Sequence, residues 1–165
     1  MYDSEALADN HDLSRFDSGQ PILDDWLRRH ARGSDAKRQG RTYVWHGGNG
    51  SVVAYFTLCP HVIERSELPR RLGHGDPDRI PALLLARLAL DRSLHGQGLG
   101  VELLLDALSR AVSASNQVGG RYVVVDAIDH DAKAFYEKYQ FISLLDKEFH
   151  LFLPVSTIRE ALGKP

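Results

Sequence analysis

Residues 83–112 read LLLARLALDRSLHGQGLGVELLLDALSRAV, which joins an apolar run, a glycine-rich loop and a helical pattern. The apolar run is part of a stretch from Ile80 to Asp91 and is typical of a strand that is covered on both faces. The glycine loop opens a helix that we expect to reach about Ser115, because apolar residues recur there at helical spacing. This order of elements favours an α/β fold.

The same order repeats downstream. Arg121–Ala127 predicts a second buried strand, and Asp131–Tyr139 predicts a short helix with Asp131 as its cap. Phe141–Leu145 and Glu148–Leu153 are expected to close the sheet. A strand, a helix and another strand in this succession favour parallel pairing of the two buried strands.

The N-terminal part predicts a helix from about Gln20 to Arg32. Ser18 is the expected cap, Pro21 suits the first turn, and Gly33 follows the expected end.

Two strands follow, Arg41–His46 and Ser51–Leu58, and the run Gly47–Gly50 between them predicts a hairpin. Residues 60–80 are charged and contain prolines, so we expect a loop.

The chain has 165 residues, 43% hydrophobic and 25% charged, which suits a single domain spanning 1–165. Cys59 is the only cysteine, so an internal disulfide and a Cys/His zinc cage are both excluded. We expect no metal site. The first residues lack the pattern of a secretory signal, and no apolar run is long enough to cross a membrane. The expected location is the cytoplasm, without a membrane partner.

The glycine loop has the physical features of a phosphate site. Gly96, Gly98 and Gly100 let backbone N–H groups approach an anion, and the following helix directs its positive end at the same place. A Rossmann fingerprint fails because the third glycine comes one residue too early. A Walker loop fails because Gly100 is followed by Val101 and Glu102.

This loop resembles the acetyl-CoA motif of the GNAT acetyltransferases, Gln/Arg-x-x-Gly-x-Gly/Ala after a strand such as RLALD, with His95 at the Gln/Arg position. Residues 134–141, AFYEKYQF, resemble the family's A-x-x-F-Y-E-x-x-G-F segment, with Gln140 in place of a glycine. The resemblance covers roughly residues 41–153. It implies a GNAT fold, a mixed central sheet with splayed strands flanked by helices.

The resemblance also implies roles for particular residues. Backbone groups of the strand would bind the pantetheine arm, and the loop would bind the pyrophosphate of acetyl-CoA. Tyr136 matches the family tyrosine that serves as general acid near the CoA sulfur; a buried tyrosine bonded to a neighbouring carbonyl is the alternative. The implied cofactor-binding residues are Leu88, Ala89, Leu90, His95, Gly96, Gln97, Gly98, Leu99 and Gly100.

The sequence names no general base. A cluster at the end of the second strand could relay a proton, but helix capping and solvation explain its members equally well: Asp126, Asp129, His130 and Asp131. Cys59 is not expected to be catalytic, because direct acetyl transfer needs no thiol nucleophile.

Residues 15–31, RFDSGQPILDDWLRRHA, resemble an F-x-C/S-G-x-x-x-L-D-x-W-L segment of one GNAT subfamily, and residues 149–162, FHLFLPVSTIREAL, continue the likeness. That subfamily contains the toxins of type II toxin–antitoxin systems that acetylate the α-amino group of aminoacyl-tRNA and block translation. The implied partners are aminoacyl-tRNA, a ribbon-helix-helix antitoxin and a second copy in a homodimer.

An α-amino group has a pKa of about 7.7–8.0, and esterification of the neighbouring carboxyl lowers it further. Much of this amine is neutral at pH 7, so a dedicated base is dispensable. A tRNA substrate needs basic residues on the enzyme. Although the net charge is −2, two strips qualify: Arg28, Arg29, Lys37, Arg38 and Arg41, and Arg70, Arg71, Arg79 and Arg87.

Plain solvation of a helix face and a loop also explains these cations. Two other functions stay open: a GNAT enzyme for a small amine or a protein N-terminus, and a catalytically silent GNAT-like protein that binds only an antitoxin at an operator.

Overall fold

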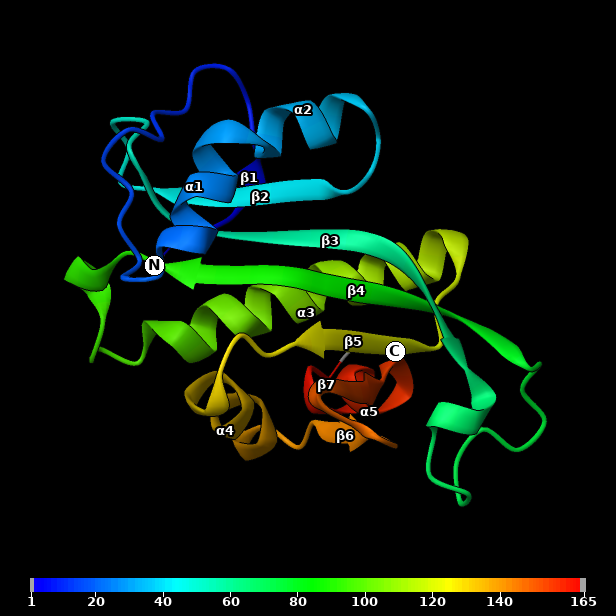
Figure 1. Cartoon of the computed structure of the whole chain (residues 1–165). Coiled ribbons are helices and arrows are strands. Elements are labelled where there is room, and N and C mark those ends of the chain that lie inside the picture. Colours follow the sequence, from blue (N-terminus) through cyan, green and yellow to red (C-terminus); the bar gives the residue numbers. More distant parts are fainter. Residues whose placement is uncertain (1, 164–165) are drawn as a thin grey trace. The chain divides into compact units, whose positions relative to one another are not determined.

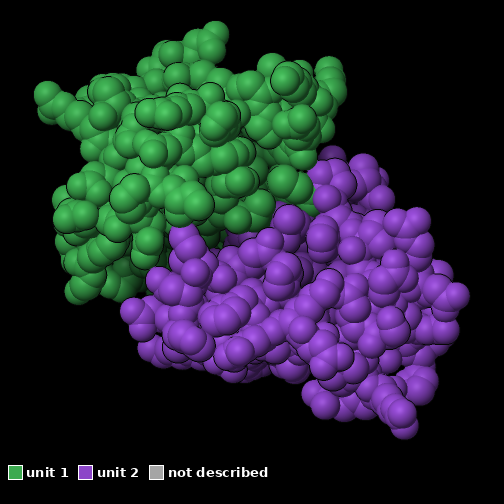
Figure 2. All heavy atoms as spheres, in the orientation of Figure 1, with its two compact units in different colours: residues 1–59, 86–107 green, residues 60–85, 108–165 purple. Residues whose placement is uncertain are grey.

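The computed structural model describes residues 2–163, so the expected domain ends, 1 and 165, lie outside the described residues. Seven strands form one mixed sheet in the order β1-β2-β3-β4-β5-β7-β6, flanked by helices (Figure 1). The chain divides into two compact units, which Figure 2 colours separately. Unit 1 comprises residues 1–59 and 86–107, and unit 2 comprises residues 60–85 and 108–165. No helix in the described part of the chain is long and apolar enough to cross a membrane.

Unit 1 contains the N-terminal helices and the hairpin. Its elements are β1 (Glu5–Ala6), α1 (Pro21–Arg29), α2 (Ala31–Ala36), β2 (Arg41–His46), the first part of β3 (Val52–Glu64), the end of β4 (Arg79–Leu90), the 3-10 turn η2 (Arg92–Leu94) and the start of α3 (Leu99–Val118). β2 and β3 pair antiparallel, as the hairpin prediction required. The core includes Phe16, Leu27, Val44 and Tyr55, which are almost fully buried.

The single helix expected from Gln20 to Arg32 is instead two helices. α1 ends at Arg29, and α2 begins at Ala31 and runs through Gly33, the residue that we expected to follow the helix end. Ser18 is not the cap: Gln20 occupies that position and makes no side-chain cap bond. The hydroxyl of Ser18 is used elsewhere, because it donates to the carboxylate of Asp24. Pro21 does lie in the first turn.

Unit 2 contains the parallel pair and the C-terminal strands. It holds the rest of β3 and β4, the 3-10 turn η1 (Arg65–Glu67), the end of α3, β5 (Tyr122–Asp126), α4 (His130–Lys138), β6 (Ile142–Leu144), β7 (Lys147–Pro154) and α5 (Val155–Ala161). β4 and β5 pair in parallel from Ala82↔Tyr122 to Leu85↔Val125, as predicted. β7 pairs antiparallel with β5 on one side and β6 on the other.

Several expectations for unit 2 were wrong at their edges. Residues 60–80 are not all loop, because β3 continues to Glu64 and η1 follows. In this stretch buried Ile63 lies between exposed Val62 and Glu64, the alternation of a strand with one buried face. Helices α4 and α5 differ too: Asp129, not Asp131, caps α4 by accepting the N–H of Ala132 at 2.8 Å, and α5 was not predicted.

The turn after α4 keeps the backbone that a glycine would adopt. Gln140 has φ +74°, in the left-handed region, although its side chain makes this conformation unfavourable. The N–H of Gln140 donates to the carbonyl of Glu137 at 3.0 Å, and the N–H of Phe141 donates to Tyr136 at 3.2 Å. These bonds close the end of α4, so the turn has the shape that the family's glycine implies.

Candidate functional site

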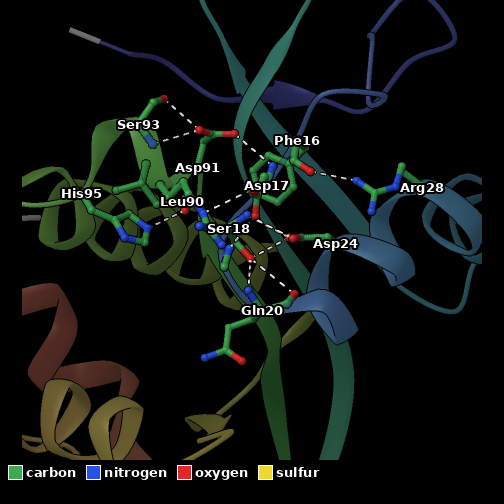
Figure 3. Close-up of polar contacts among 12 residues, drawn as sticks. Phe16, Asp17, Ser18, Gln20, Asp24, Arg28, Leu90, Asp91, Ser93 and His95 are labelled. Carbon is green, nitrogen blue, oxygen red and sulfur yellow. Dashed lines mark hydrogen bonds and ion pairs between the residues drawn. The ribbon is translucent and has the colours of Figure 1, made fainter.

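Hydrogen bonds of Asp91 stabilise the start of the loop between β4 and α3 (Figure 3). The carboxylate of Asp91 accepts hydrogen bonds from the N–H of Ser93 at 3.0 Å and from its hydroxyl at 2.8 Å. It also accepts the N–H of Asp17 at 3.0 Å. Partial burial acts to raise the pKa of Asp91, but these hydrogen bonds outweigh it and hold the pKa below its usual value. Asp91 is therefore charged at neutral pH and fixes the start of the loop.

The side chains of the loop bind the preceding backbone. Nε2 of His95 donates to the carbonyl of Leu90 at 2.8 Å, and because a carbonyl only accepts, this nitrogen carries the proton (Figure 3). The side-chain amide of Gln97 donates to the carbonyl of Ser93 at 3.4 Å. His95 and Gln97 thus stabilise the loop.

The loop backbone forms an open cradle. Gly96 and Gly98 both have φ +76°, and no atom lies within 4 Å of the position that a Cβ would take at either residue. α3 begins directly afterwards, at Leu99, and the first N–H groups of a helix have no partner within it. The open space, the glycine backbone and the helix start fit a pyrophosphate group.

Strand β4, which leads to this loop, extends past the residues that pair with β5. The last recorded β4–β5 pair is Leu85↔Val125, whereas β4 continues to Leu90. Leu88, Ala89 and Leu90 therefore lie past the parallel ladder, where their backbone groups can meet a ligand. Ala89 is buried, and Leu88 and Leu90 are half-buried.

Asp24 organises the segment before α1. Only 5% of Asp24 is exposed, and its carboxylate accepts the Ser18 hydroxyl at 2.6 Å and the Ser18 N–H at 3.1 Å (Figure 3). Arg28 donates from Nη1 to the carbonyl of Phe16 at 2.8 Å. The hydrogen bonds between Ser18 and Asp24 thus hold the segment before α1 against this helix. Both residues belong to the F-D-S-G…L-D-x-W-L segment, and the sequence alone did not indicate this structural role.

Arg87 lies against α1. Its guanidinium is 3.7 Å from the centroid of the Trp26 ring, a cation–π contact, and Trp26 also stacks on Tyr55 with ring centroids 6.2 Å apart. The hydroxyl of Tyr55 donates to the carbonyl of Leu23 at 2.7 Å. The sequence-based strip of Arg70, Arg71, Arg79 and Arg87 is therefore divided, because Arg87 belongs to unit 1 and the other three to unit 2.

The other predicted cations fall into two sets. Around α1 and α2, all five members of the first strip are exposed: Arg28, Arg29, Lys37, Arg38 and Arg41. A pocket of about 400 Å³ there is lined by Trp26, Arg29 and Lys37, among others. In unit 2, Arg70, Arg71 and Arg79 are exposed, and Arg79 pairs with Glu64 at 3.7 Å.

Tyr136 is enclosed by aromatic rings in unit 2. It is 6% exposed and makes edge-on contacts with Phe135 and Phe141, at centroid distances of 5.4 and 5.5 Å. Burial, and then the charge of Asp126, raise the pKa of Tyr136 well above its usual value. Within the described residues its hydroxyl makes no hydrogen bond to a carbonyl. The phenol is therefore protonated at neutral pH and can donate a proton.

Comparison with known proteins shows the family. The model of the acetyltransferase (GNAT) family matches residues 7–141. The chain belongs to the GNAT acetyltransferases. Its mixed seven-stranded sheet with flanking helices is the GNAT fold that the sequence predicted.

Several relatives match this GNAT chain over nearly its whole length. A tRNA-acetylating toxin from Mycobacterium tuberculosis (strain ATCC 25618 / H37Rv) is 35% identical over 157 residues, 95% of this chain and 94% of the relative. The structure of AtaT complexed with acetyl-methionyl-tRNAfMet has a TM-score of 0.89 and 33% identity, covering 98% of this chain and 99% of that one. A Tyr→Phe mutant of the AtaT toxin, bound to the C-terminus of the antitoxin AtaR and acetyl-CoA, has a TM-score of 0.84 and 32% identity, with 99% of each chain covered.

The four candidates for a general base have different surroundings in the structure. Asp129 caps α4, Asp131 is exposed in its first turn, and His130 contacts the ring of Phe149 at a centroid distance of 4.9 Å. Asp126 differs, because its carboxylate lies 2.9 Å from Nδ1 of His150. No local pattern in the sequence indicates this pair, since it depends on the register between β5 and β7.

Cys59 is half-buried, and burial raises the pKa of its thiol. The thiol is therefore poorly suited to nucleophilic catalysis, consistent with the sequence-based expectation.

A cluster of Glu5, His11 and His46 has ligand types that suit a metal, but its hydrogen bonds argue against one. Nε2 of His11 and Nε2 of His46 lie 2.6 and 2.8 Å from Oε1 of Glu5. Nδ1 of His11 accepts the N–H of Ala8, and Nδ1 of His46 accepts the N–H of Gly48. Each Nε2 therefore carries a proton that points at Glu5, and neither has the lone pair that a cation requires. The cluster holds β1 to β2.

Proposed function

We propose that the protein is a toxin that transfers the acetyl group of acetyl-CoA to the α-amino group of aminoacyl-tRNA and so blocks translation. The observation that carries this proposal is the likeness to a tRNA-acetylating toxin over 95% of the chain, which includes the α1–α2 segment as well as the GNAT motifs. This segment lies outside the predicted acetyl-CoA motif and carries the exposed basic strip.

The acetyl-CoA half of the proposal uses the glycine loop and the end of β4. The N–H groups of Gly96–Gly100 would bind the pyrophosphate, and the backbone of Leu88, Ala89 and Leu90 would hold the pantetheine arm. An N–H of this strand would polarise the thioester carbonyl. Tyr136, held protonated by its burial, would donate a proton to the departing sulfur. Support comes from the open cradle beside Gly96 and Gly98.

The tRNA half of the proposal uses the cations of unit 1. Arg28, Arg29, Lys37, Arg38 and Arg41 surround α1 and α2, and Arg87 lies on Trp26 of α1. Phosphate contacts of this kind supply much of the affinity of a protein for RNA, without sequence specificity. Arg70, Arg71 and Arg79 are a second candidate set; Arg79 has an acidic partner, as Arg28 has in the first set.

We also propose that the chain is one acetyltransferase domain, because the family match at 7–141 includes residues of both units. As proposed partners we name a ribbon-helix-helix antitoxin, whose binding would neutralise the toxin, and a second copy in a homodimer. A similar toxin structure contains the C-terminus of its antitoxin, which supports the first of these. A substrate of aminoacyl-tRNA places the proposed activity in the cytoplasm.

The proposal is tested by incubating the protein with radiolabelled acetyl-CoA and either charged or uncharged tRNA. We expect label on charged tRNA alone. Label on free amines or protein termini, with none on charged tRNA, would indicate the alternative GNAT activity. Absence of acetyl-CoA binding would instead support the silent GNAT-like protein.

A further inference from the structure

Asp126 and His150 form a carboxylate–imidazole pair at the end of β5. They are directly opposite each other in the antiparallel β5–β7 ladder, so both side chains lie on the same face of the sheet. Oδ1 of Asp126 is 2.9 Å from Nδ1 of His150, and the two side chains are 45% and 46% exposed. A carboxylate only accepts, so in neutral His150 the proton is on Nδ1 and Nε2 has the lone pair. The pair is thus arranged as a base with its orienting carboxylate.

Further along β5 and β7, the face that carries this pair is mainly apolar. Residues two apart on a strand share a face, so Asp126 lies on the side of Val124, and His150 on the side of Phe152. Val124 and Phe152 belong to the core of unit 2 together with Ile63. By the same alternation, His61 of β3 lies on this face. The pair therefore stands beside a buried apolar surface rather than on an isolated part of the exterior.

The charge of Asp126 links this pair to Tyr136. It is the second cause, after burial, of the raised pKa of Tyr136, so the carboxylate is within electrostatic range of the phenol. Asp126 also acts on His61, whose pKa is lowered mainly by burial. A proton donor and a proton acceptor therefore lie around one carboxylate, entirely within unit 2.

We propose that His150 is the general base of the acetyl transfer, with Nε2 as the accepting atom, and that Asp126 is its positioning residue. This inference rests on the proposed function. Nε2 takes one proton from the α-ammonium group, and the amine nitrogen then bonds to the thioester carbon. As the C–S bond breaks, Tyr136 gives a proton to the sulfur and regains one from the nitrogen through solvent. His150 releases its proton to water, so the products are the N-acetylated amine and free CoA.

The base would extend activity to a pH at which the amine is protonated. Several charged groups act on His61: Asp126 on β5, Glu67 on η1, and His150 and Lys147 on β7. Lys147 and Glu67 pair at 2.7 Å and largely offset each other. Asp126 is the acidic group in direct contact with His150, at 2.9 Å. Above the pKa of the amine, at about 7.7–8.0 or lower, the substrate is already neutral and the base becomes dispensable.

The test is kcat/KM for acetylation of charged tRNA by the wild-type protein and His150→Gln, measured between pH 6.5 and 8.5. We expect the variant to lose roughly 10-fold or more at pH 6.5 and less than about 3-fold at pH 8.5. Asp126→Asn should give a smaller loss with the same pH trend. His74→Gln is the matched control, because His74 is exposed in the same unit and has no assigned role.

Acetyl-CoA affinity and melting temperature show whether each variant is folded. A loss in His150→Gln that is the same at every pH, or no loss at pH 6.5, would overturn the proposal while leaving the toxin function intact. A wild-type protein that labels no charged tRNA would overturn the toxin function as well. If His150→Gln does not fold, the pH trend of Asp126→Asn decides.

Discussion

Asp24 and Tyr136 are two polar side chains that the fold buries for different purposes. Asp24 is surrounded by donors, since it accepts both the hydroxyl and the N–H of Ser18, and it serves to shape the chain before α1. Tyr136 is surrounded by aromatic rings, and burial keeps its proton in place. Within the described residues the Tyr136 hydroxyl makes no hydrogen bond to a carbonyl, so its proton can be given to a substrate.

Replacing Tyr136 with Phe should lower kcat by about 10²-fold or more and leave the affinity for acetyl-CoA unchanged, because only the proton donor is removed. The raised pKa has a definite sign: the phenol is protonated below it, so ionisation of Tyr136 should cause no loss of wild-type activity between pH 7 and 9. Steady-state kinetics across this range measure both effects.

Tyr139→Phe is the matched control, since Tyr139 follows α4 directly and is half-buried. Equal losses in the two variants would contradict the assignment of the acid to Tyr136.

At the residue scale, the sequence predicted what depends on local pattern. The glycine loop and Tyr136 lie in contiguous motifs whose spacing is visible in the chain. Asp126 was considered as one of four candidates, but His150 was missed, because the pair depends on the β5–β7 register. Arg87 was assigned to the wrong neighbours for the same reason: its contact with Trp26 joins residues far apart in the chain.

At the scale of elements, apolar periodicity predicted the strands and helices well but not their ends. α1 ends early and α2 follows it at once, because the capping groups are used in tertiary contacts: Ser18 bonds to Asp24 instead of capping the helix. β3 continues past its expected end, since Ile63 is buried in the apolar core of unit 2. End positions thus depend on contacts that a local pattern does not contain.

The turn after α4 offers a test at this scale. Gln140→Gly should raise the free energy of unfolding by about 1 kcal/mol, because Gln140 has φ +74° and glycine adopts this conformation without strain. Urea denaturation measures the change. Gln117→Gly is the matched control: Gln117 is exposed in the last turn of α3, where glycine is unfavourable, so this variant should lose up to about 1 kcal/mol. Destabilisation of the Gln140 variant would show that the side chain has a role of its own.

At the scale of the whole molecule, a net charge of −2 hides an uneven distribution. From α1 to the start of β2, unit 1 carries six exposed cations, Arg32 included, and Arg87 lies on the Trp26 ring of α1. Acidic groups of unit 2 are engaged with cations, as in Glu67–Lys147 and Glu148–Lys133. A protein with this distribution can bind RNA without being basic overall.

The salt dependence of tRNA affinity tests this distribution. A triple substitution of Arg29, Lys37 and Arg41 by Ala should weaken tRNA binding and reduce the slope of log K against log salt by about 2–3, since each lost phosphate contact contributes about 0.7–0.9. The same substitution of Arg70, Arg71 and Arg79 is the comparison, and we expect a smaller change. Filter binding at several salt concentrations gives both slopes. The reverse ranking would place the tRNA on unit 2.

The central claim is that the acetyl group goes to the α-amino nitrogen of aminoacyl-tRNA. The most direct measurement is mass spectrometry of charged tRNA that has been treated with the protein and acetyl-CoA and then digested with nuclease. The account predicts an N-acetyl-aminoacyl-adenosine, which is absent when the tRNA is uncharged and strongly reduced with Tyr136→Phe. Acetyl groups found on a base or ribose, or only unmodified aminoacyl-adenosine despite bound acetyl-CoA, would contradict it.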